Sequence, residues 1–487
     1  VKQGIQEVFV VRIFYQVIDL VVFKVICSFL NLSWTKTRKI MKSEDKTKMR
    51  ISRRDFIGSS LAAAAGLGIN GKDGLFGGKT IQELEKPKIK EYRTLGRTGF
   101  KVSDISFGGG SLTDEAILAT ALEAGVNYID TAEHYSRGNS ETNVGKVLKG
   151  RDRKSMFITT KLNFRGGLPT KESLRDRFLK CLERLQMDYV DCLMIHMTPK
   201  VEQVTHEPYH ELIRELKTEG KVRFSGLSCH GTEHTLYGNT KERMEDILLA
   251  AADDGRFDVA LFVYNFMQKE QGEKILKACK DKNMGTTLMK VNPIKFYSDI
   301  EVQYNRVKDS GREMSDAQKD IYEEVSTRSA EAESFKDKYG ITGAALALEA
   351  SIKFCLSNPD VHAVCPTPNT YEDLDAFLAQ SGQRLESRDK EFLADYQASC
   401  GAFYCRHACG ECESACPNQV PVNSIMRYDH YFRAQGREKY ALEHYARISG
   451  QNAGFCKSCP GFCQQACPFN VPIHCLLTLA HQTLTLA

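Results

Sequence analysis

The chain carries little net charge and has no long uninterrupted apolar run. Its 66 Lys and Arg oppose 62 Asp and Glu, a net charge of +4 over 487 residues. No basic stripe with interleaved aromatic residues is present, which argues against nucleic-acid binding. The apolar stretch at residues 5–32 is broken by Arg12, Asp19 and Lys24. Charges at such depths each cost about 2.5–3.5 kcal/mol on insertion scales, so a membrane-spanning helix is not expected there.

Cysteine, by contrast, is abundant, and eight of the 17 cysteines form two quartets near the C-terminus. Gaps of two and three residues let several thiolates meet at one site, and four sulfur ligands suit an iron–sulfur cluster or zinc. Each quartet ends in Cys-Pro, as in the bacterial ferredoxin run, although gaps of three occur where that run has two. Iron–sulfur is therefore favoured over structural zinc or a disulfide framework. The quartets are Cys405, Cys409, Cys412, Cys416 and Cys456, Cys459, Cys463, Cys467.

The stretches that follow the two quartets also repeat. Cys416-Pro-Asn-Gln-Val-Pro-Val corresponds to Cys467-Pro-Phe-Asn-Val-Pro-Ile, and a repeated unit with matched ligands implies two similar clusters. The ferredoxin resemblance implies that the fourth cysteine of each run serves the other cluster. One cluster would then take Cys405, Cys409, Cys412 and Cys467, and the other Cys416, Cys456, Cys459 and Cys463. Two self-contained quartets are the rival arrangement.

A targeting segment is predicted ahead of the main fold. Ser52-Arg53-Arg54-Asp55-Phe56-Ile57 precedes a weakly apolar run at residues 56–69 that is rich in Ala and Gly. This arrangement resembles a twin-arginine export signal, and the run is too short for an ordinary spanning helix. We expect export to the periplasm, or membrane association if the segment is retained, and a cytoplasmic location otherwise. The predicted divisions are an over-extended start at 1–40, the signal at 41–70 and a linker at 71–91.

From residue 92 to residue 396, short apolar segments rich in β-formers alternate with amphipathic helical stretches. Continuous apolar strands indicate a parallel sheet that is covered on both faces. Eight such units predict an α/β fold of the TIM (β/α)8 type rather than an open doubly wound sheet. A polar insertion at 297–338 is expected to be helical and to lie over the barrel mouth. The predicted strands are Ile105–Gly108, Val126–Asp130, Met156–Lys161, Val190–His196, Val222–Ser228, Asp258–Asn265, Gly285–Lys290 and Val361–Cys365.

Polar residues stand where successive predicted strands end: Asp130, Lys161, His196, Ser228 and Asn265. In a TIM barrel the carboxyl ends of the strands form the active-site face. Any one of these residues could be a satisfied core polar group, but five at equivalent positions favour a site.

The chain resembles the aldo/keto reductase family over the whole predicted barrel. The matching stretches are Tyr92-Arg-Thr-Leu-Gly-Arg-Thr-Gly-Phe-Lys-Val-Ser, Asn127-Tyr-Ile-Asp-Thr-Ala-Glu-His-Tyr-Ser-Arg-Gly-Asn-Ser-Glu, Ile158-Thr-Thr-Lys and Asp191-Cys-Leu-Met-Ile-His. The resemblance implies a catalytic tetrad of Asp130, Tyr135, Lys161 and His196. The two quartets resemble a subgroup of the family that ends in a small α-helical, ferredoxin-like domain with two 4Fe–4S clusters, here residues 397–487.

Carbonyl reduction explains why these four residue types belong together. Tyr135 can give a proton to the carbonyl oxygen, but an ordinary phenol with a pKa near 10 is a weak acid at neutral pH. A cationic Lys161 nearby, held by Asp130, is expected to lower that pKa. A neutral His196 would donate a hydrogen bond to the oxygen as charge develops.

A nicotinamide dinucleotide, NAD(P), is the cofactor that the family resemblance implies. Its contacts would fall on Ser228, Asn265, Thr367, Asn369 and Thr370, the last three at a helix N-terminus where free N–H groups can hold phosphate. The pattern is incomplete, because the basic residue for a 2′-phosphate is absent. Cys229 and Leu261 also replace an expected Asn and Gln.

The predicted activity is that of an aldo/keto-reductase-like oxidoreductase acting on a small carbonyl or alcohol substrate. The iron–sulfur domain suggests a redox partner protein. The alternative is an electron-transfer protein whose barrel is a scaffold without carbonyl chemistry.

Overall fold

The structure is a computed structural model that describes residues 86–485 apart from 232–241, 295–315, 342–344 and 449. The predicted over-extended start, the twin-arginine segment and most of the linker lie outside these residues. Within the described part of the chain, no helix is both long and apolar enough to cross a membrane.

Eight parallel strands form the central sheet, in sequence order from β3 to β10. The two outermost strands meet, because Ile105 forms a parallel bridge with Val364 and the Ser106 amide donates to the Val364 carbonyl over 2.9 Å. The sheet therefore closes on itself, as a TIM barrel does, and the open doubly wound alternative is wrong. Each predicted strand is present within two residues at either end. The strands are β3 (Phe107–Gly108), β4 (Tyr128–Asp130), β5 (Phe157–Asn163), β6 (Val190–His196), β7 (Val222–Cys229), β8 (Val259–Val263), β9 (Gly285–Met289) and β10 (Ala363–Val364).

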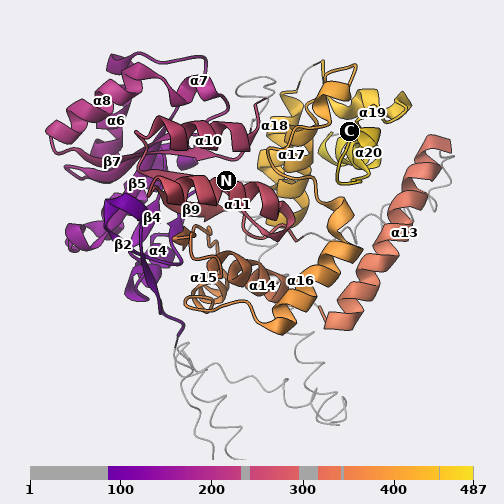
Figure 1. The fold of residues 1–487 in the computed structure, drawn as a ribbon, viewed down its shortest axis with the longest axis horizontal. Coiled ribbons are helices and arrows are strands. Elements are labelled where there is room, and N and C mark those ends of the chain that lie inside the picture. The colour runs from indigo at the N-terminus through magenta and orange to yellow at the C-terminus, as the bar shows by residue number, and fades with distance from the viewer. Residues whose placement is uncertain (1–85, 232–241, 295–315, 342–344, 449, 486–487) are drawn as a thin grey trace, which may run out of the picture. The chain divides into compact units, whose positions relative to one another are not determined.

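The helices that cover the barrel bury one apolar stripe each, and their ends follow ordinary capping chemistry. In α6 the Thr170 side chain accepts a hydrogen bond from the Ser173 amide at the N-terminus, and Leu174, Phe178 and Leu182 face the core. Figure 1 shows these helices around the strands. They are α4 (Glu115–Glu123), α5 (Asn139–Leu148), α6 (Lys171–Leu185), α7 (Val201–Val204), α8 (Glu207–Thr218), α10 (Met244–Asp254), α11 (Lys269–Asp281), α14 (Ala345–Leu356), α15 (Tyr371–Leu378) and α16 (Ser387–Ser399).

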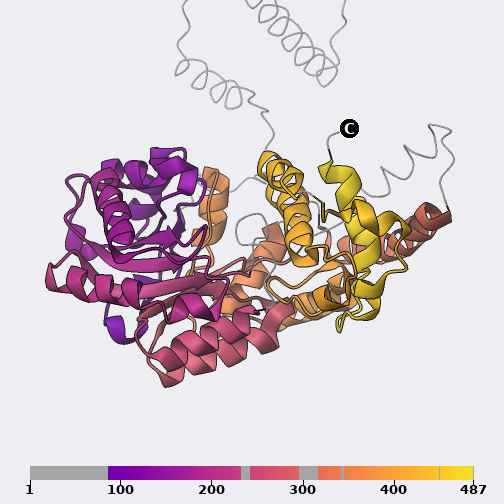
Figure 2. The ribbon, with the colours of Figure 1, turned by 90° about the horizontal axis from the view of Figure 1, so that it is seen from above.

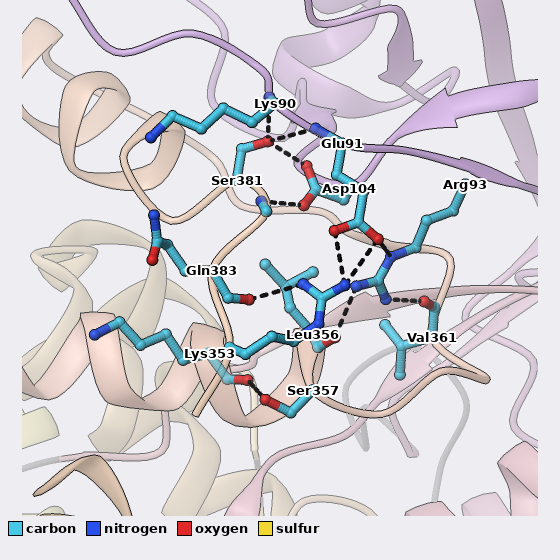
Figure 3. A network of polar contacts seen from close by, with 12 residues as sticks. Lys90, Glu91, Arg93, Asp104, Lys353, Leu356, Ser357, Val361, Ser381 and Gln383 are labelled. Carbon is cyan, nitrogen blue, oxygen red and sulfur yellow. Dashed lines mark hydrogen bonds and ion pairs between the residues drawn. The ribbon is translucent and has the colours of Figure 1, made fainter. Parts of the chain in front are cut away.

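A short antiparallel hairpin, β1 (Tyr92–Thr94) and β2 (Lys101–Ser103), precedes the barrel. Leu95 and Val102 are fully buried and join the apolar cluster that fills the barrel interior. A polar clamp, shown in Figure 3, ties this N-terminal segment to residues far along the chain: the Ser381 hydroxyl accepts from the Lys90 amide over 2.8 Å and donates to Asp104 over 2.6 Å. The hairpin was not predicted, because three-residue strands with exposed alternate positions leave little periodic signal.

The C-terminal segment is helical and has its own apolar cluster, built around Ile425, Tyr428, Leu476 and Leu477. The repeat seen in the sequence is also a structural repeat. Gln419 and Asn470 adopt matching left-handed φ angles of 51° and 52°. In each copy a proline then occupies the N-cap position of a helix, Pro421 before α17 and Pro472 before α20. The elements are α17 (Val422–Gln435), α18 (Glu438–Ala446), α19 (Phe462–Gln465) and α20 (Ile473–Leu484), with short 3-10 turns η5 (Gly401–Phe403), η6 (Glu413–Ala415) and η7 (Ala453–Ser458).

The polar insertion is helical where it is described, and that part packs against the C-terminal helices. Helix α13 (Asp316–Tyr339) packs against α16 and α20, and Figure 1 shows it along the edge of the C-terminal helices. Its Tyr322 and Val325 enter the apolar cluster of the C-terminal segment. The amphipathic pattern predicted the helix, whereas its packing partner depends on distant residues.

Candidate active site and cysteine cavities

The four predicted catalytic residues come together at the carboxyl ends of the first barrel strands. Asp130 is the last residue of β4, Lys161 lies within β5 and His196 is the last residue of β6. Tyr135 opens the 3-10 turn η2 (Tyr135–Gly138) that follows β4. Parallel strands in register bring their ends to one face, so residues about 30 positions apart become neighbours.

Lys161 is fully buried and held by two oxygen atoms. Its ammonium group donates to the Asp130 carboxylate over 2.5 Å and to the Thr131 carbonyl over 2.7 Å. The same group lies 4.8 Å from the centre of the Tyr135 ring. The Tyr135 hydroxyl is 3.5 Å from Nε2 of His196. A phenol, an ammonium and an imidazole therefore converge on one point.

Burial decides the acidity of the tyrosine. Desolvation raises the pKa of Tyr135, the Lys161 ammonium lowers it, and the net result is a pKa of about 12. The expected lowering below the ordinary value is wrong for this structure, although the lysine acts in the predicted direction. Burial also opposes the charge on Lys161, but Asp130 and Tyr135 outweigh it, and the pKa of Lys161 is raised.

His196 is neutral near pH 7. Burial, followed by the neighbouring His134 and Lys161, lowers the pKa of His196 well below its ordinary value. The His134 ring stacks on His196 with ring centres 4.6 Å apart. His134 was not predicted as a site residue, although it stands next to Tyr135 in the motif that identified the tetrad.

Two residues predicted to contact the nicotinamide, Ser228 and Asn265, form hydrogen bonds to other groups of the protein. The buried Ser228 hydroxyl accepts from the Met197 amide over 2.9 Å. The Asn265 amide group donates to the Lys290 carbonyl and to the Tyr404 hydroxyl, and its oxygen accepts from the amides of Met267 and Gln268. Asn265 thus has no free hydrogen-bonding position for a nicotinamide.

The predicted phosphate contacts lie at the N-terminus of α15, as expected. Thr370 caps the helix, and its hydroxyl accepts from the Asp373 amide over 3.0 Å. The Asp373 carboxylate in turn accepts from the amides of Asn369 and Thr370. These two N–H groups are therefore occupied by a carboxylate, and the same helix end carries Glu372. Thr367 lies against the Gly108 backbone, where an added Cβ would meet its hydroxyl at 2.7 Å.

The eight C-terminal cysteines line two separate cavities that open to solvent. Each cavity is lined by three cysteines of one quartet and by the Cys-Pro cysteine of the other. The first cavity is lined by Cys405, Cys409, Cys412 and Cys467. The second cavity is lined by Cys416, Cys456, Cys459 and Cys463. The start of α17 lines the first cavity with Val422 and Asn423, and α20 lines the second with His474 and Leu477.

The cysteine sulfurs also receive hydrogen bonds. The Val420 amide donates to Cys416 over 3.4 Å, and the Asn423 side-chain amide donates to Cys405 over 3.8 Å. All 16 described cysteines are free, so no disulfide framework forms among them. Within the described residues, no group of three or more His, Cys, Asp or Glu side chains lies close enough to hold a single metal ion.

The first cavity is joined to the barrel mouth by side chains that were not predicted. Tyr404, next to Cys405, donates from its hydroxyl to the Gln268 side chain over 3.0 Å and accepts from Asn265 over 3.2 Å. Gln268 also binds the His407 backbone in both directions, over 3.1 Å and 2.8 Å. The turn after β8 is therefore held against the segment that contains Cys405.

Sequence similarity to known proteins covers the barrel. The sequence model of the aldo/keto reductase family matches residues 105–392. The chain is 36% identical over 154 residues to L-galactose dehydrogenase of Arabidopsis thaliana, covering 28% of this chain and 48% of that protein. It is 29% identical over 220 residues to the NADH-specific methylglyoxal reductase of Escherichia coli, covering 39% and 62%. The chain thus spans about half to three fifths of the length of these relatives.

Among solved structures, a similar one is the aldo-keto reductase AKR11C1 of Bacillus halodurans in its holo form. It is 23% identical, with a TM-score of 0.44, and the match covers 62% of this chain and 95% of that one.

Proposed function

Because the chain belongs to the aldo/keto reductase family, we propose that it interconverts a carbonyl and an alcohol on a small substrate. The observation that carries this proposal is the convergence of Tyr135, Lys161 and His196 at the carboxyl end of a closed parallel barrel. The alternative of an electron carrier with an inactive barrel has no support among the relatives named above.

In the reducing direction, Tyr135 gives its hydroxyl proton to the carbonyl oxygen. With a pKa of about 12, the phenol is protonated at neutral pH and is ready to act as an acid. Neutral His196 donates a hydrogen bond to the same oxygen and stabilises the charge that forms on it. Lys161, held by Asp130, then stabilises the tyrosinate that remains.

The electron pair would come from a hydride donor, and nicotinamide dinucleotide is the donor named for the Escherichia coli relative. These residues fit a bound dinucleotide incompletely, because Asn265 and the backbone amides of Asn369 and Thr370 already form hydrogen bonds within the protein. Titration with NADH and with NADPH, followed by fluorescence, tests this part of the proposal.

Replacement of Tyr135 by Phe tests the proton donor. We expect turnover of a carbonyl substrate to fall by about 10²–10⁴-fold, the usual contribution of a general acid, with an unchanged melting temperature. Tyr128→Phe is the matched control, since Tyr128 is another buried barrel phenol, and its hydroxyl accepts a hydrogen bond from the Thr159 hydroxyl. Full activity of the Tyr135 variant would reject the assignment.

We further propose that the two cysteine cavities hold 4Fe–4S clusters. Two features support the fit: four cysteines around each cavity, and amide donors aimed at Cys416 and Cys405. Four thiolates are the usual ligands of such clusters, which supply one-electron transfer.

Export by the twin-arginine route is proposed from Arg53 and Arg54 alone. Exchange of both for lysine is expected to leave the protein in the cytoplasm of its host, as judged by cell fractionation. Exchange of Lys46 and Lys48 for arginine, a charge-conserving change within the same segment, is the control and should not alter localisation. Normal export of the double-lysine variant would contradict the proposal.

A further inference from the structure

Exposed phenylalanines gather around the cysteine cavities. Seven large apolar side chains are strongly exposed in the described residues, and three of them are Phe455, Phe462 and Phe469. Phe455, 48% exposed, and Phe462, 42% exposed, both line the second cavity. Contiguous exposed apolar side chains beside a functional centre mark an interaction surface more often than scattered ones do. Phe455, Phe462 and the exposed Lys457 between them are called the Phe455–Phe462 face below.

This face lacks negative charge. Residues 444–487 contain no Asp or Glu, whereas Arg447 and Lys457 are present and exposed. No carboxylate is among the described residues that line the second cavity, while Glu411 and Glu413 line the first. A partner that docks at the second cavity is therefore expected to present negative charge.

The two cavities also differ in how directly hydrogen bonds connect them to the barrel. The first is linked to strand β8 through Tyr404, Asn265 and Gln268. The second is framed by η7, α19 and α20. Figures 1 and 2 both show α19 and α20 on the side of α17 that faces away from the first barrel strands. The second cavity is thus the outer one and the first is the inner one.

We propose that the Phe455–Phe462 face docks a small acidic one-electron carrier protein, which passes electrons to the outer cluster and from there to the inner cluster beside the barrel. This inference rests on the clusters of the proposed function. In each event the carrier is oxidised by one electron and the outer cluster is reduced by one, with no proton or group transferred. A small apolar contact with a charged rim suits the brief encounters of electron-transfer proteins.

Stopped-flow reduction of the anaerobic, cluster-loaded protein tests the proposal, with a reduced acidic two-cluster ferredoxin as the probe. We expect Lys457→Glu and the double variant Phe455→Ser/Phe462→Ser each to slow the second-order reaction by about tenfold or more at low salt, because steering and contact are lost. Reduction by dithionite, which needs no docking, is expected to stay unchanged. Leu168→Ser is the matched control, since Leu168 is 43% exposed on the barrel, and it should react like the parent protein.

Unchanged rates with the ferredoxin in both variants would overturn the docking proposal, and so would an equal slowing with dithionite. Binding of the parent protein to anionic phospholipid vesicles, lost in the phenylalanine variant while ferredoxin rates stay normal, would identify a membrane-facing surface and also overturn it. Absence of iron from the parent protein is a different result, because it rejects the clusters before docking is tested.

Discussion

At the scale of single residues, the Tyr135 phenol experiences two opposing effects. Burial raises the pKa of Tyr135, and the Lys161 ammonium lowers it, with burial dominant. A phenol that stays protonated at neutral pH favours the donation of a proton over its removal. The two reaction directions should therefore depend on pH in different ways.

Lys161→Met tests this balance. Removal of the cation raises the pKa of Tyr135 further, by about 1–3 pH units for a nearby opposite charge. Alcohol oxidation needs the phenolate, so its rate should rise with pH up to about 12 in the parent protein and fall by about tenfold or more in the variant at any pH below that. Carbonyl reduction needs the phenol and should fall less.

The measurement is a pH profile of both directions. Asp130→Asn/Lys161→Met is the companion variant, because the single change leaves the Asp130 carboxylate buried without its ammonium partner. Equal losses in both directions and in both variants would show that Lys161 acts on structure and not on the acidity of Tyr135.

At the scale of elements, side chains outside the eight barrel strands connect the N-terminal hairpin to the end of the barrel. Arg93 in β1 donates to the carbonyls of Val361 and Leu356 over 2.5 Å and 2.7 Å, and to the Glu91 carboxylate over 2.8 Å. Its side chain is only 10% exposed. Arg384 binds the same carboxylate, over 2.7 Å, from an exposed position. Figure 3 shows the Arg93 guanidinium group beside Glu91.

Arg93→Ala is expected to lower the free energy of unfolding by about 2–3 kcal/mol, because two buried carbonyls lose a charged donor. Arg384→Ala, its control, should cost about 1 kcal/mol or less, as exposed ion pairs do. Denaturant unfolding of both variants, followed by circular dichroism, provides the comparison. Equal effects would mean that the clamp contributes no more than a surface ion pair.

The strands and helices of the barrel were predictable because each carries a local pattern. The apolar run Cys192–Ile195 is buried along its length, so the sequence shows it directly. The β1–β2 hairpin and the packing of α13 on α20 were not predictable. The first has too few residues for a period, and the second depends on an apolar surface that only the folded C-terminal segment creates.

At the scale of the whole molecule, each cysteine quartet contributes one cysteine to the cavity of the other. Cys416 lies with the second quartet and Cys467 with the first, as the ferredoxin resemblance implied. The grouping of the thiols is a property of the fold, while cluster binding remains the proposal.

Paired cysteine replacements distinguish crossed from self-contained ligation. Cys405→Ala/Cys467→Ala removes two ligands from one cavity, so about four iron per chain should remain of about eight. If each quartet were self-contained, both clusters would be damaged and little iron would remain. Cys405→Ala/Cys416→Ala is the matched variant with the opposite expectation. Iron and sulfide analysis after anaerobic purification measures both, with circular dichroism to verify folding.

Local patterns along the chain were enough to predict the βα repeat and the two groups of four cysteines, because both depend on residue type and short spacing. The tetrad was implied by the family resemblance. Three outcomes depended on long-range packing: the burial that raises the pKa of Tyr135, the Asn265–Tyr404 hydrogen bond across 139 positions, and the sharing of one cavity by Cys405 and Cys467. Desolvation and contact between distant segments arise only when the chain is folded, because no short window of sequence contains both partners.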